Sequence, residues 1–324
     1  VRELIDFIGR ASGPDKPFFT VVWFGSPHEP YSGLPADLAL YDNLPGKYKD
    51  KQVRLTSNET GSPTTRPQGD VLRERYAEIT AMDRSIGTLR AYLADEGLRN
   101  DTLLFYCGDN GTSRDGSLVT PHRGVKGEVY DGGILVPGLI EWPARVSKPR
   151  STKIRASTSD LLPTLCGIVG QALPERPIDG IDLTPLIDGT MTSRSNPLYF
   201  WKFANSNGNG AQSEDYLDPE LQVGTTPLVK LMGGIATRNF KNLKHPTIRA
   251  ADYLGPRAII DGHFKLVVRE SKSGETEQEL FNLKKDPAET KNLIKTKTAA
   301  AKKLRAELRQ WQESVLNSLT GADY

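Results

Sequence analysis

The sequence predicts an α/β domain over residues 1–195, followed by a smaller α+β unit over residues 196–324. In the first part, apolar runs typical of buried strands alternate with a long amphipathic helix. In the second part, a hairpin signal precedes a terminal helix. Proline and glycine accumulate between residues 174 and 197, so we place the domain boundary there.

The elements of the first part follow in order. Residues 1–10 form an amphipathic pattern that predicts a helix, and the continuous apolar run FFTVVWF at 18–24 predicts a strand buried on both faces. Residues 32–70 lack periodicity and predict a long surface excursion. Apolar residues spaced by three or four predict a helix at 71–96, with Asp70 as its N-cap and Gly97 as its C-cap.

The run TLLFY at 102–106 predicts another buried strand, so strand, helix and strand alternate in the manner of a parallel sheet. A short strand is expected at 134–140 and a helix at 158–169. In the second part, PLYFWKF is followed by a Gly/Asn-rich insertion to about residue 252. The runs around the DG turn in 257–270 then predict a hairpin. A strand at 277–283 and a helix at 295–317 complete this unit.

Composition excludes several classes of function. The chain has 42 basic and 40 acidic side chains, a net charge of +2, which predicts no nucleic-acid partner. No apolar run is long enough to span a membrane. Cys107 and Cys166 lie outside any zinc pattern, and the sequence leaves their pairing open. The chain begins in mid-helix at Val1 without an initiator methionine, so we expect it to be part of a longer protein.

Two loops follow predicted strands and carry polar residues. In FYCGDNGTSRDG, Asp109 and Asn110 offer two hard oxygen donors, which suit Ca²⁺ or Mg²⁺ rather than zinc. On spacing alone, an ordinary turn, in which such residues are favoured, is the commoner case. His28, in GSPHEP, is placed to protonate a leaving group, or is a structural histidine.

The segment HRGVKGEVYDGG offers a cation among glycines. Lys126 suits an anion that approaches the backbone closely, although a solvated lysine is the commoner case. His122 and Arg123 are candidates for the same anion pocket. His245, within 203–252, either reaches substrate or belongs to a solvated surface.

Six collinear segments together resemble one family: PHEP, RYAEITAMDRSIGTLRAYLADEGL, LLFYCGDNG, HRGVKGEVYDGGILVPGLIEWPARV, SDLLPTLCGIVG and LFNLKKDPAETKNL. The chain resembles the C-terminal two-thirds of the formylglycine-dependent (type I) sulfatases of the alkaline phosphatase superfamily. The resemblance implies an α/β/α sandwich, incomplete at the N-terminus, with a C-terminal antiparallel sheet and helix. It also implies a secreted or periplasmic location.

The resemblance assigns roles to individual positions. Asp109 and Asn110 correspond to metal ligands, usually of calcium rather than magnesium. Lys126 corresponds to a lysine that contacts a sulfate oxygen, and His28 to a histidine that helps the alcohol leave. The implied substrate is a sulfate ester of a small molecule or a carbohydrate.

The chain departs from this family at the nucleophile. No Cys/Ser-x-Pro/Ala-x-Arg motif occurs, and the tandem N-terminal aspartates of the metal site are missing. We expect the formylglycine upstream, in a full-length hydrolase, and expect this chain alone to be inactive. Two alternatives stay open: a phosphatase or phosphodiesterase of the same superfamily, and a non-catalytic protein that binds sulfated glycans.

Overall fold

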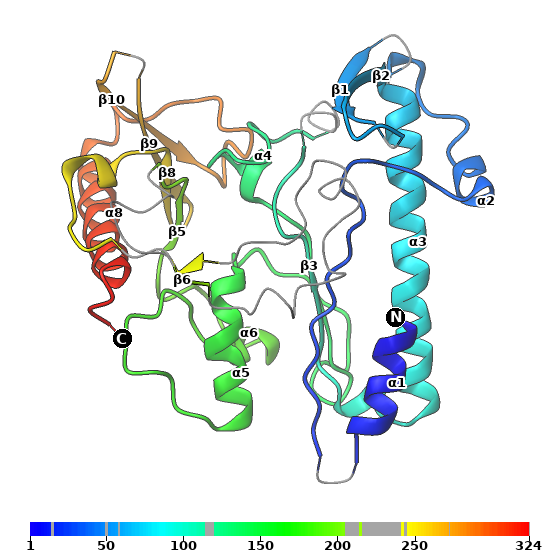
Figure 1. Cartoon of the computed structure of the whole chain (residues 1–324). Helices are drawn as coiled ribbons and strands as arrows, with labels where there is room; N and C mark the ends of the chain where they lie inside the picture. Colours follow the sequence, from blue (N-terminus) through cyan, green and yellow to red (C-terminus); the bar gives the residue numbers. More distant parts are fainter. Residues whose placement is uncertain are drawn as a thin grey trace. The chain divides into compact units, whose positions relative to one another are not determined.

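The computed structural model describes residues 1–323 except 14–15, 49–50, 58, 114–119, 205–213, 216–240, 243–244 and 272. The chain divides into two compact units (Figure 1). Unit 1 comprises residues 1–106, 114–118 and 138–147, and unit 2 comprises 107–113, 119–137 and 148–324. The boundary that the sequence predicts between residues 195 and 196 stays a prediction.

Unit 1 is built mainly from helices, a hairpin and a strand pair. Its helices are α1 (Arg2–Ala11), α2 (Pro35–Ala39) and α3 (Gln68–Asp95), with short 3-10 turns at Gly46–Tyr48 and Arg99–Asp101. Strands β1 (Gln52–Thr56) and β2 (Pro63–Pro67) form an antiparallel hairpin. Strand β3 (Leu104–Cys107) pairs with β4 (Gly138–Glu141) and leads into unit 2 at Cys107.

Helix α3 confirms the long helix expected from the spacing of apolar residues. It begins earlier than predicted, with Pro67 as N-cap, so Asp70 lies in the first turn and does not cap the helix. The carboxylate of Asp70 still lies at the positive end of the helix dipole. Gly97 follows the C-cap residue with φ of 69°, a backbone conformation that glycine adopts without strain.

The strand predicted at 18–24 is wrong for this structure. Residues 17–25 form no strand, and Phe19 and Trp23 are 68% and 92% exposed. An apolar run becomes a strand buried on both faces only where neighbouring strands bond its backbone and other layers cover its side chains. The described part of the chain supplies neither to this segment.

The prediction of a surface excursion at 32–70 was also incomplete. Helix α2 and the β1–β2 hairpin lie within it, and Val53 and Leu55 point into a small core with Tyr31 and Val71. The alternation in β1 covers five residues, too few to stand out among prolines and glycines.

Unit 2 contains the larger sheet. Its four strands, in the order β10-β9-β8-β5, are all antiparallel to their neighbours. Their bounds are β5 Leu198–Trp201, β8 Arg257–Asp261, β9 Phe264–Glu270 and β10 Thr276–Asn282. Its helices are α4 (Asp131–Ile134), α5 (Leu161–Val169), α6 (Thr184–Ile187) and α8 (Thr298–Leu319). Short 3-10 turns lie at Thr158–Asp160 and Ala250–Tyr253, and β6 (Glu214–Asp215) pairs with β7 (Lys241–Asn242).

The structure confirms the predicted hairpin, the strand after it, the helix that includes 161–169 and the terminal helix. The strand expected at 134–140 instead forms at Gly138–Glu141, because residues 131–134 make a helical turn. The short turn between β8 and β9 contains Gly262 at φ 57°, which accounts for the DG signal.

Both faces of the four-stranded sheet are covered. Alternate side chains Ile259, Leu266 and Leu280 pack against Leu304 and Leu308 of α8. The opposite face packs Ile260, Val267 and Phe281 against Val129 and Tyr130. The polypeptide just before α4 is therefore part of the hydrophobic core of the sheet, which makes the position of that segment depend on the sheet.

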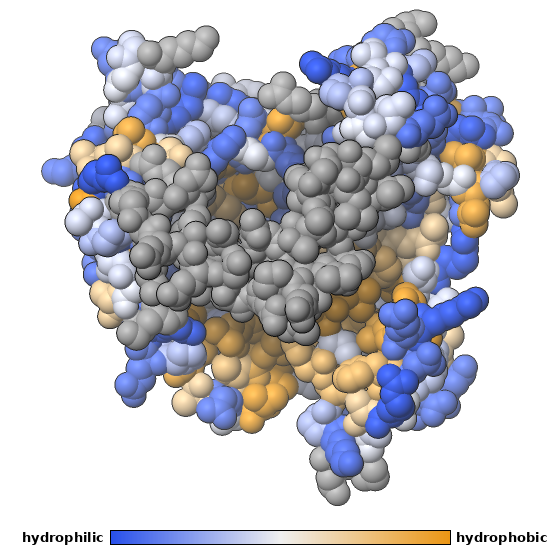
Figure 2. Space-filling view, in the orientation of Figure 1, coloured by the Kyte–Doolittle hydropathy of each residue, from blue (hydrophilic) through white to orange (hydrophobic). Residues whose placement is uncertain are grey.

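Two further points from the sequence analysis concern the cysteines and a membrane span. Cys107 and Cys166 are both free thiols, so the pairing left open by the sequence does not form. Among the described residues, no helix has the length and apolar character needed to cross a membrane. The face shown in Figure 2 carries both hydrophobic and hydrophilic residues.

Candidate active-site loops

The loop after β3 presents Asp109 and Asn110. The Asp109 Oδ1 accepts a hydrogen bond from the Asn110 backbone N–H at 2.9 Å, and Asn110 Nδ2 donates to the carbonyl of Gly111 at 3.0 Å. These bonds occupy the amide nitrogen of Asn110 and leave its side-chain oxygen available to a ligand. Asp109 is exposed. Two oxygen donors thus stand at the end of a strand.

Backbone hydrogen bonds join this loop to the segment that carries Lys126. Gly111 N–H donates to Gly133 O at 2.8 Å, and Thr112 N–H donates to Gly132 O at 2.9 Å. In return, the Lys126 N–H donates to Thr112 O at 2.7 Å. The structure therefore joins the loop that carries Asp109 and Asn110 to the segment that carries Lys126, which the sequence could place only as separate loops.

Glycines allow the two loops to come this close. A Cβ atom on Gly111 would lie 2.2 Å from Gly132 O, and one on Gly132 would lie 2.1 Å from Gly124 O. Real Cβ atoms do not approach a carbonyl oxygen to such distances, so a larger residue would push the two backbone segments apart. The run of glycines in this segment is explained by packing of backbone on backbone.

The ammonium group of Lys126 is free to meet a ligand. Its side chain is exposed and forms no ion pair or side-chain hydrogen bond within the described residues. Its backbone, by contrast, is held by Thr112. A lysine with an uncommitted ammonium group is able to meet an anion as a point charge.

A buried ionic cluster holds the segment that carries Lys126 to strand β9. Asp131, directly after Tyr130, lies 2.8 Å from Lys265 Nζ through its Oδ1 and 3.2 Å from Arg155 through its Oδ2. Lys265 is also 2.8 Å from Glu289, whose other oxygen accepts from the Asp131 N–H at 2.7 Å. Asp131, Lys265 and Glu289 are at most 1% exposed.

Charge and burial act in opposite directions on the two carboxylates. Burial raises the pKa of Asp131, but Lys265 and Arg155 outweigh it and hold that pKa below its usual value. For Glu289, burial dominates over Lys265 and raises the pKa. Sequence reasoning missed this cluster, because three residues so far apart in the chain give no local signal.

The side chain of Arg123 is held by contacts with other residues of the protein. Its guanidinium lies 3.0 Å from Glu279, and its Cζ stands 4.0 Å from the centre of the Tyr130 ring. Tyr130 also donates to Glu279, and burial together with that carboxylate raises the pKa of Tyr130 to about 12. Arg123 thus joins its loop to β10, and its predicted contact with substrate stays a prediction.

The candidate histidines of unit 2, His122 and His245, have different surroundings. His122 Nδ1 donates to Pro287 O at 3.2 Å. His245 is 1% exposed and packs edge-on against Phe203, with ring centres 5.4 Å apart. Much of the 203–252 segment lies outside the described residues. The substrate-binding roles of both histidines stay predictions.

His28 belongs to unit 1. Its Nδ1 donates to Glu29 O at 2.6 Å, which leaves Nε2 available, and the residue is exposed. Two carboxylates hold its loop: Glu29 accepts from Thr56 N–H at 2.8 Å, and Glu78 of α3 accepts from Ser32 N–H at 2.9 Å. Burial raises the pKa of Glu78, and the Ser32 hydrogen bond and the nearby His28 oppose that rise.

The donor set fits part of a calcium site. Asp109 and Asn110 provide hard oxygen atoms, whereas Ca²⁺ takes about six to eight oxygen ligands. Within the described residues, no three His, Cys, Asp or Glu side chains gather into a metal-binding group. The pair is therefore suited to a hard cation but supplies only a fraction of its ligands.

Comparisons with known proteins point to one family. A family model described as Sulfatase matches residues 1–171. Human arylsulfatase A is 39% identical over 140 residues, which cover 42% of this chain and 26% of that protein. The ulvan-active sulfatase of Formosa agariphila is 30% identical over 192 residues, 58% of this chain and 35% of that protein.

Solved structures share the fold. The crystal structure of Ps i-CgsB in complex with k-i-k-neocarrahexaose has a TM-score of 0.65 at 20% identity, over 96% of this chain and 53% of that one. A sulfatase from Pseudoalteromonas sp. has a TM-score of 0.55 at 19% identity, over 98% of this chain and 52% of that one. The chain thus spans between a quarter and about half of these relatives.

Proposed function

The chain belongs to the sulfatase family, and we propose that the complete protein hydrolyses sulfate esters. The observation that carries this proposal is the joining of two loops by backbone hydrogen bonds. These bonds join the loop of Asp109 and Asn110 to the segment that carries Lys126, whose side chain makes no ion pair within the described residues. A positive charge and a metal-binding pair stabilise the charge that develops when an anionic ester is hydrolysed.

Each residue has a separate role in the proposal. The Lys126 ammonium attracts the sulfuryl oxygens and stabilises charge that builds on them in the transition state. Asp109 and Asn110 would hold a calcium ion, which supplies further positive charge when bound. In its doubly protonated form, His28 would give the Nε2 proton to the departing alcohol oxygen while its Nδ1–H donates to a carbonyl.

In this proposal, the nucleophile belongs to a part of the protein outside these 324 residues. The sequence contains no Cys/Ser-x-Pro/Ala-x-Arg motif, which the family converts to formylglycine. Neither Cys107 nor Cys166 lies in such a motif. Burial and the charge of Asp109 raise the pKa of Cys107, so its reactive thiolate is disfavoured at neutral pH.

The substrate class we propose is a sulfate ester of a small molecule or a carbohydrate. Relatives with 30% identity or more are named for aryl sulfates and for ulvan, and the similar structure of Ps i-CgsB holds an oligosaccharide. These names support a broad class, not a particular compound.

Turnover of an aryl sulfate and of the matching aryl phosphate by the full-length protein tests the proposal. We expect sulfate to be preferred, and Lys126→Met to lower kcat/KM for sulfate by about 10²-fold or more, as loss of one preorganised donor does. Lys153→Met, at another exposed lysine, is the control. Preference for phosphate, or unchanged sulfate turnover in Lys126→Met, would refute the proposal.

A further inference from the structure

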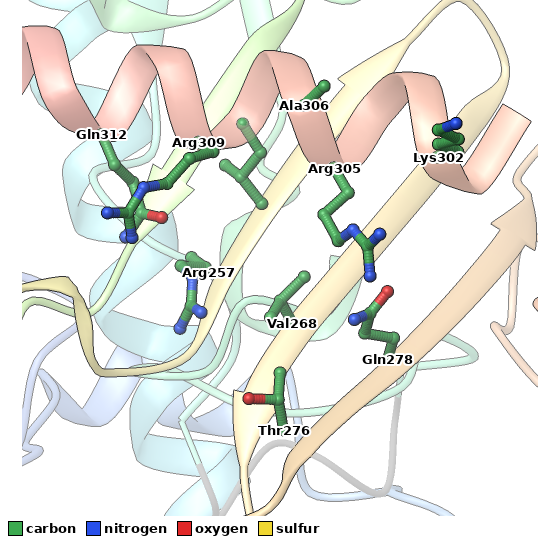
Figure 3. Close-up of a pocket in the computed structure, with 10 residues that line it drawn as sticks. Arg257, Val268, Thr276, Gln278, Lys302, Arg305, Ala306, Arg309 and Gln312 are labelled. Atoms are coloured by element: carbon green, nitrogen blue, oxygen red, sulfur yellow. The ribbon is translucent and has the colours of Figure 1, made fainter.

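A pocket of about 410 Å³ lies between helix α8 and the four-stranded sheet (Figure 3). The strands contribute Arg257, Val268 and Gln278, among others, and the helix contributes Lys302, Arg305 and Arg309. All of these residues belong to unit 2, and none of them takes part in the loops described above. The pocket is thus a separate feature of the C-terminal sheet and helix.

The lining of this pocket is positively charged. Four cationic side chains line it, and no carboxylate does among the residues described there. Two of the four are neutralised nearby: Arg257 lies 2.6 Å from Glu270, and Arg309 lies 3.0 Å from Glu313. Within the described chain, the side chains of Lys302 and Arg305 make no ion pair or hydrogen bond. Two positive charges therefore remain unbalanced.

The helix places the free charges on one side. Lys302 and Arg305 are three residues apart, so they lie on the same face of α8. Figure 3 shows the Arg305 guanidinium extending toward the side-chain amide of Gln278 on β10. A guanidinium binds a sulfate or carboxylate through two parallel hydrogen bonds, and a lysine adds a point charge beside it.

The base of the pocket has a different character. Val268 and Leu308 lie at its base and are only 3% and 2% exposed, so they offer little surface to a ligand. Gln312, also buried, donates to Tyr253 O at 3.1 Å, so its amide is held in place. The exposed charged side chains at the rim are therefore the part of the pocket that a ligand meets.

We propose that this pocket binds an anionic saccharide, with a sulfate or carboxylate group held by Arg305 and Lys302 at its rim. The oxyanion is inferred from the pocket alone. The choice of a saccharide rests on the proposed function as well. A second binding site for a charged saccharide would increase the affinity of the protein for polymeric or oligomeric substrates.

Binding of a fluorescently labelled, sulfated heparin tetrasaccharide to the full chain tests this proposal without any need for turnover. We expect the double variant Lys302→Gln/Arg305→Gln to bind at least tenfold more weakly than the wild type. Lys303→Gln is a control on the same helix, because it removes a positive charge outside the pocket lining. It should bind like the wild type. Both substituted positions are exposed, so thermal unfolding should be unchanged.

Several outcomes would overturn the proposal. One is a double variant with wild-type affinity, and another is an equal loss in Lys303→Gln, which would indicate general attraction by net charge. A third is competition by inorganic sulfate at the same concentration as the tetrasaccharide, since the pocket would then serve a free ion. Lys126→Gln separates the two sites: if it alone abolishes binding, the pocket proposal fails and the proposed function is untouched.

Discussion

Asp131 and Lys265 form an ion pair in the interior of unit 2, with 2.8 Å between Oδ1 and Nζ and with both side chains at most 1% exposed. Lys265 belongs to β9 of the sheet, and Asp131 ends the segment that carries Lys126. The pair therefore ties the candidate active-site loop to the sheet. Glu289 completes the cluster and bonds the Asp131 backbone.

Removing the cation should destabilise the protein strongly. Lys265→Met leaves Asp131 and Glu289 buried without their shared partner, which typically costs about 3–5 kcal/mol of unfolding free energy. Urea unfolding measures this loss. Lys303→Met, which removes an exposed lysine paired with Asp261, should change stability little. Similarly small losses of unfolding free energy in both variants would show that the buried cluster does not stabilise the fold.

The cluster should make stability depend on pH in a defined direction. Because the folded-state pKa of Asp131 is below its ordinary value of 3.8, its contribution is present above that value and is lost as the pH falls through the folded pKa. The stability advantage of the wild type over Asp131→Asn should therefore shrink between about pH 5 and about pH 3. Urea unfolding across this range tests it, and a constant difference would contradict it.

Glu289 should show the opposite dependence. Burial raises its pKa above the ordinary 4.5, so its contribution is present below that value and is lost as the pH rises through the folded pKa. The wild type should lose stability relative to Glu289→Gln over this rise. The same titration series measures it, and a relative gain with rising pH would exclude the expected sign.

A single methyl group should disturb the joined loops. Gly132→Ala would place Cβ 2.1 Å from Gly124 O, and overpacking of this kind costs about 1–3 kcal/mol. Gly87→Ala, at an exposed position of α3, is the control, since its Cβ meets nothing within 4 Å. That change should stabilise the protein by about 0.5–1 kcal/mol, because alanine favours a helix. Equal effects on thermal unfolding would mean that the loops yield easily.

The role of His28 should depend on the leaving group. A proton donor matters most when the departing alcohol is a poor leaving group, so His28→Gln should lower kcat for a phenyl sulfate by about 10²–10⁴-fold. The loss for 4-nitrophenyl sulfate should be smaller. Turnover of the two esters by the full-length protein measures the contrast. Equal losses would assign His28 to positioning and not to proton transfer.

The fold was predictable wherever local pattern decides structure. Helix α3, the β8–β9 hairpin and helix α8 follow from periodicity and turn residues that act over a few positions. The run at 18–24 was misread, because burial of a strand depends on partners that periodicity does not describe. The β1–β2 hairpin was missed because its pattern is short.

By itself, the sequence determined the resemblance to sulfatases, the candidate residues Asp109, Asn110 and Lys126, and the absence of a nucleophile motif. Only the tertiary structure showed that Gly111 and Thr112 donate hydrogen bonds to Gly133 and Gly132 and so join the two loops, and that Asp131, Lys265 and Glu289 form a buried cluster. The physical reason is that both arrangements depend on contacts between separate segments of the chain. A motif records which chemical groups are present, whereas their approach depends on backbone packing between the two loops and on buried charge between segments more than a hundred residues apart.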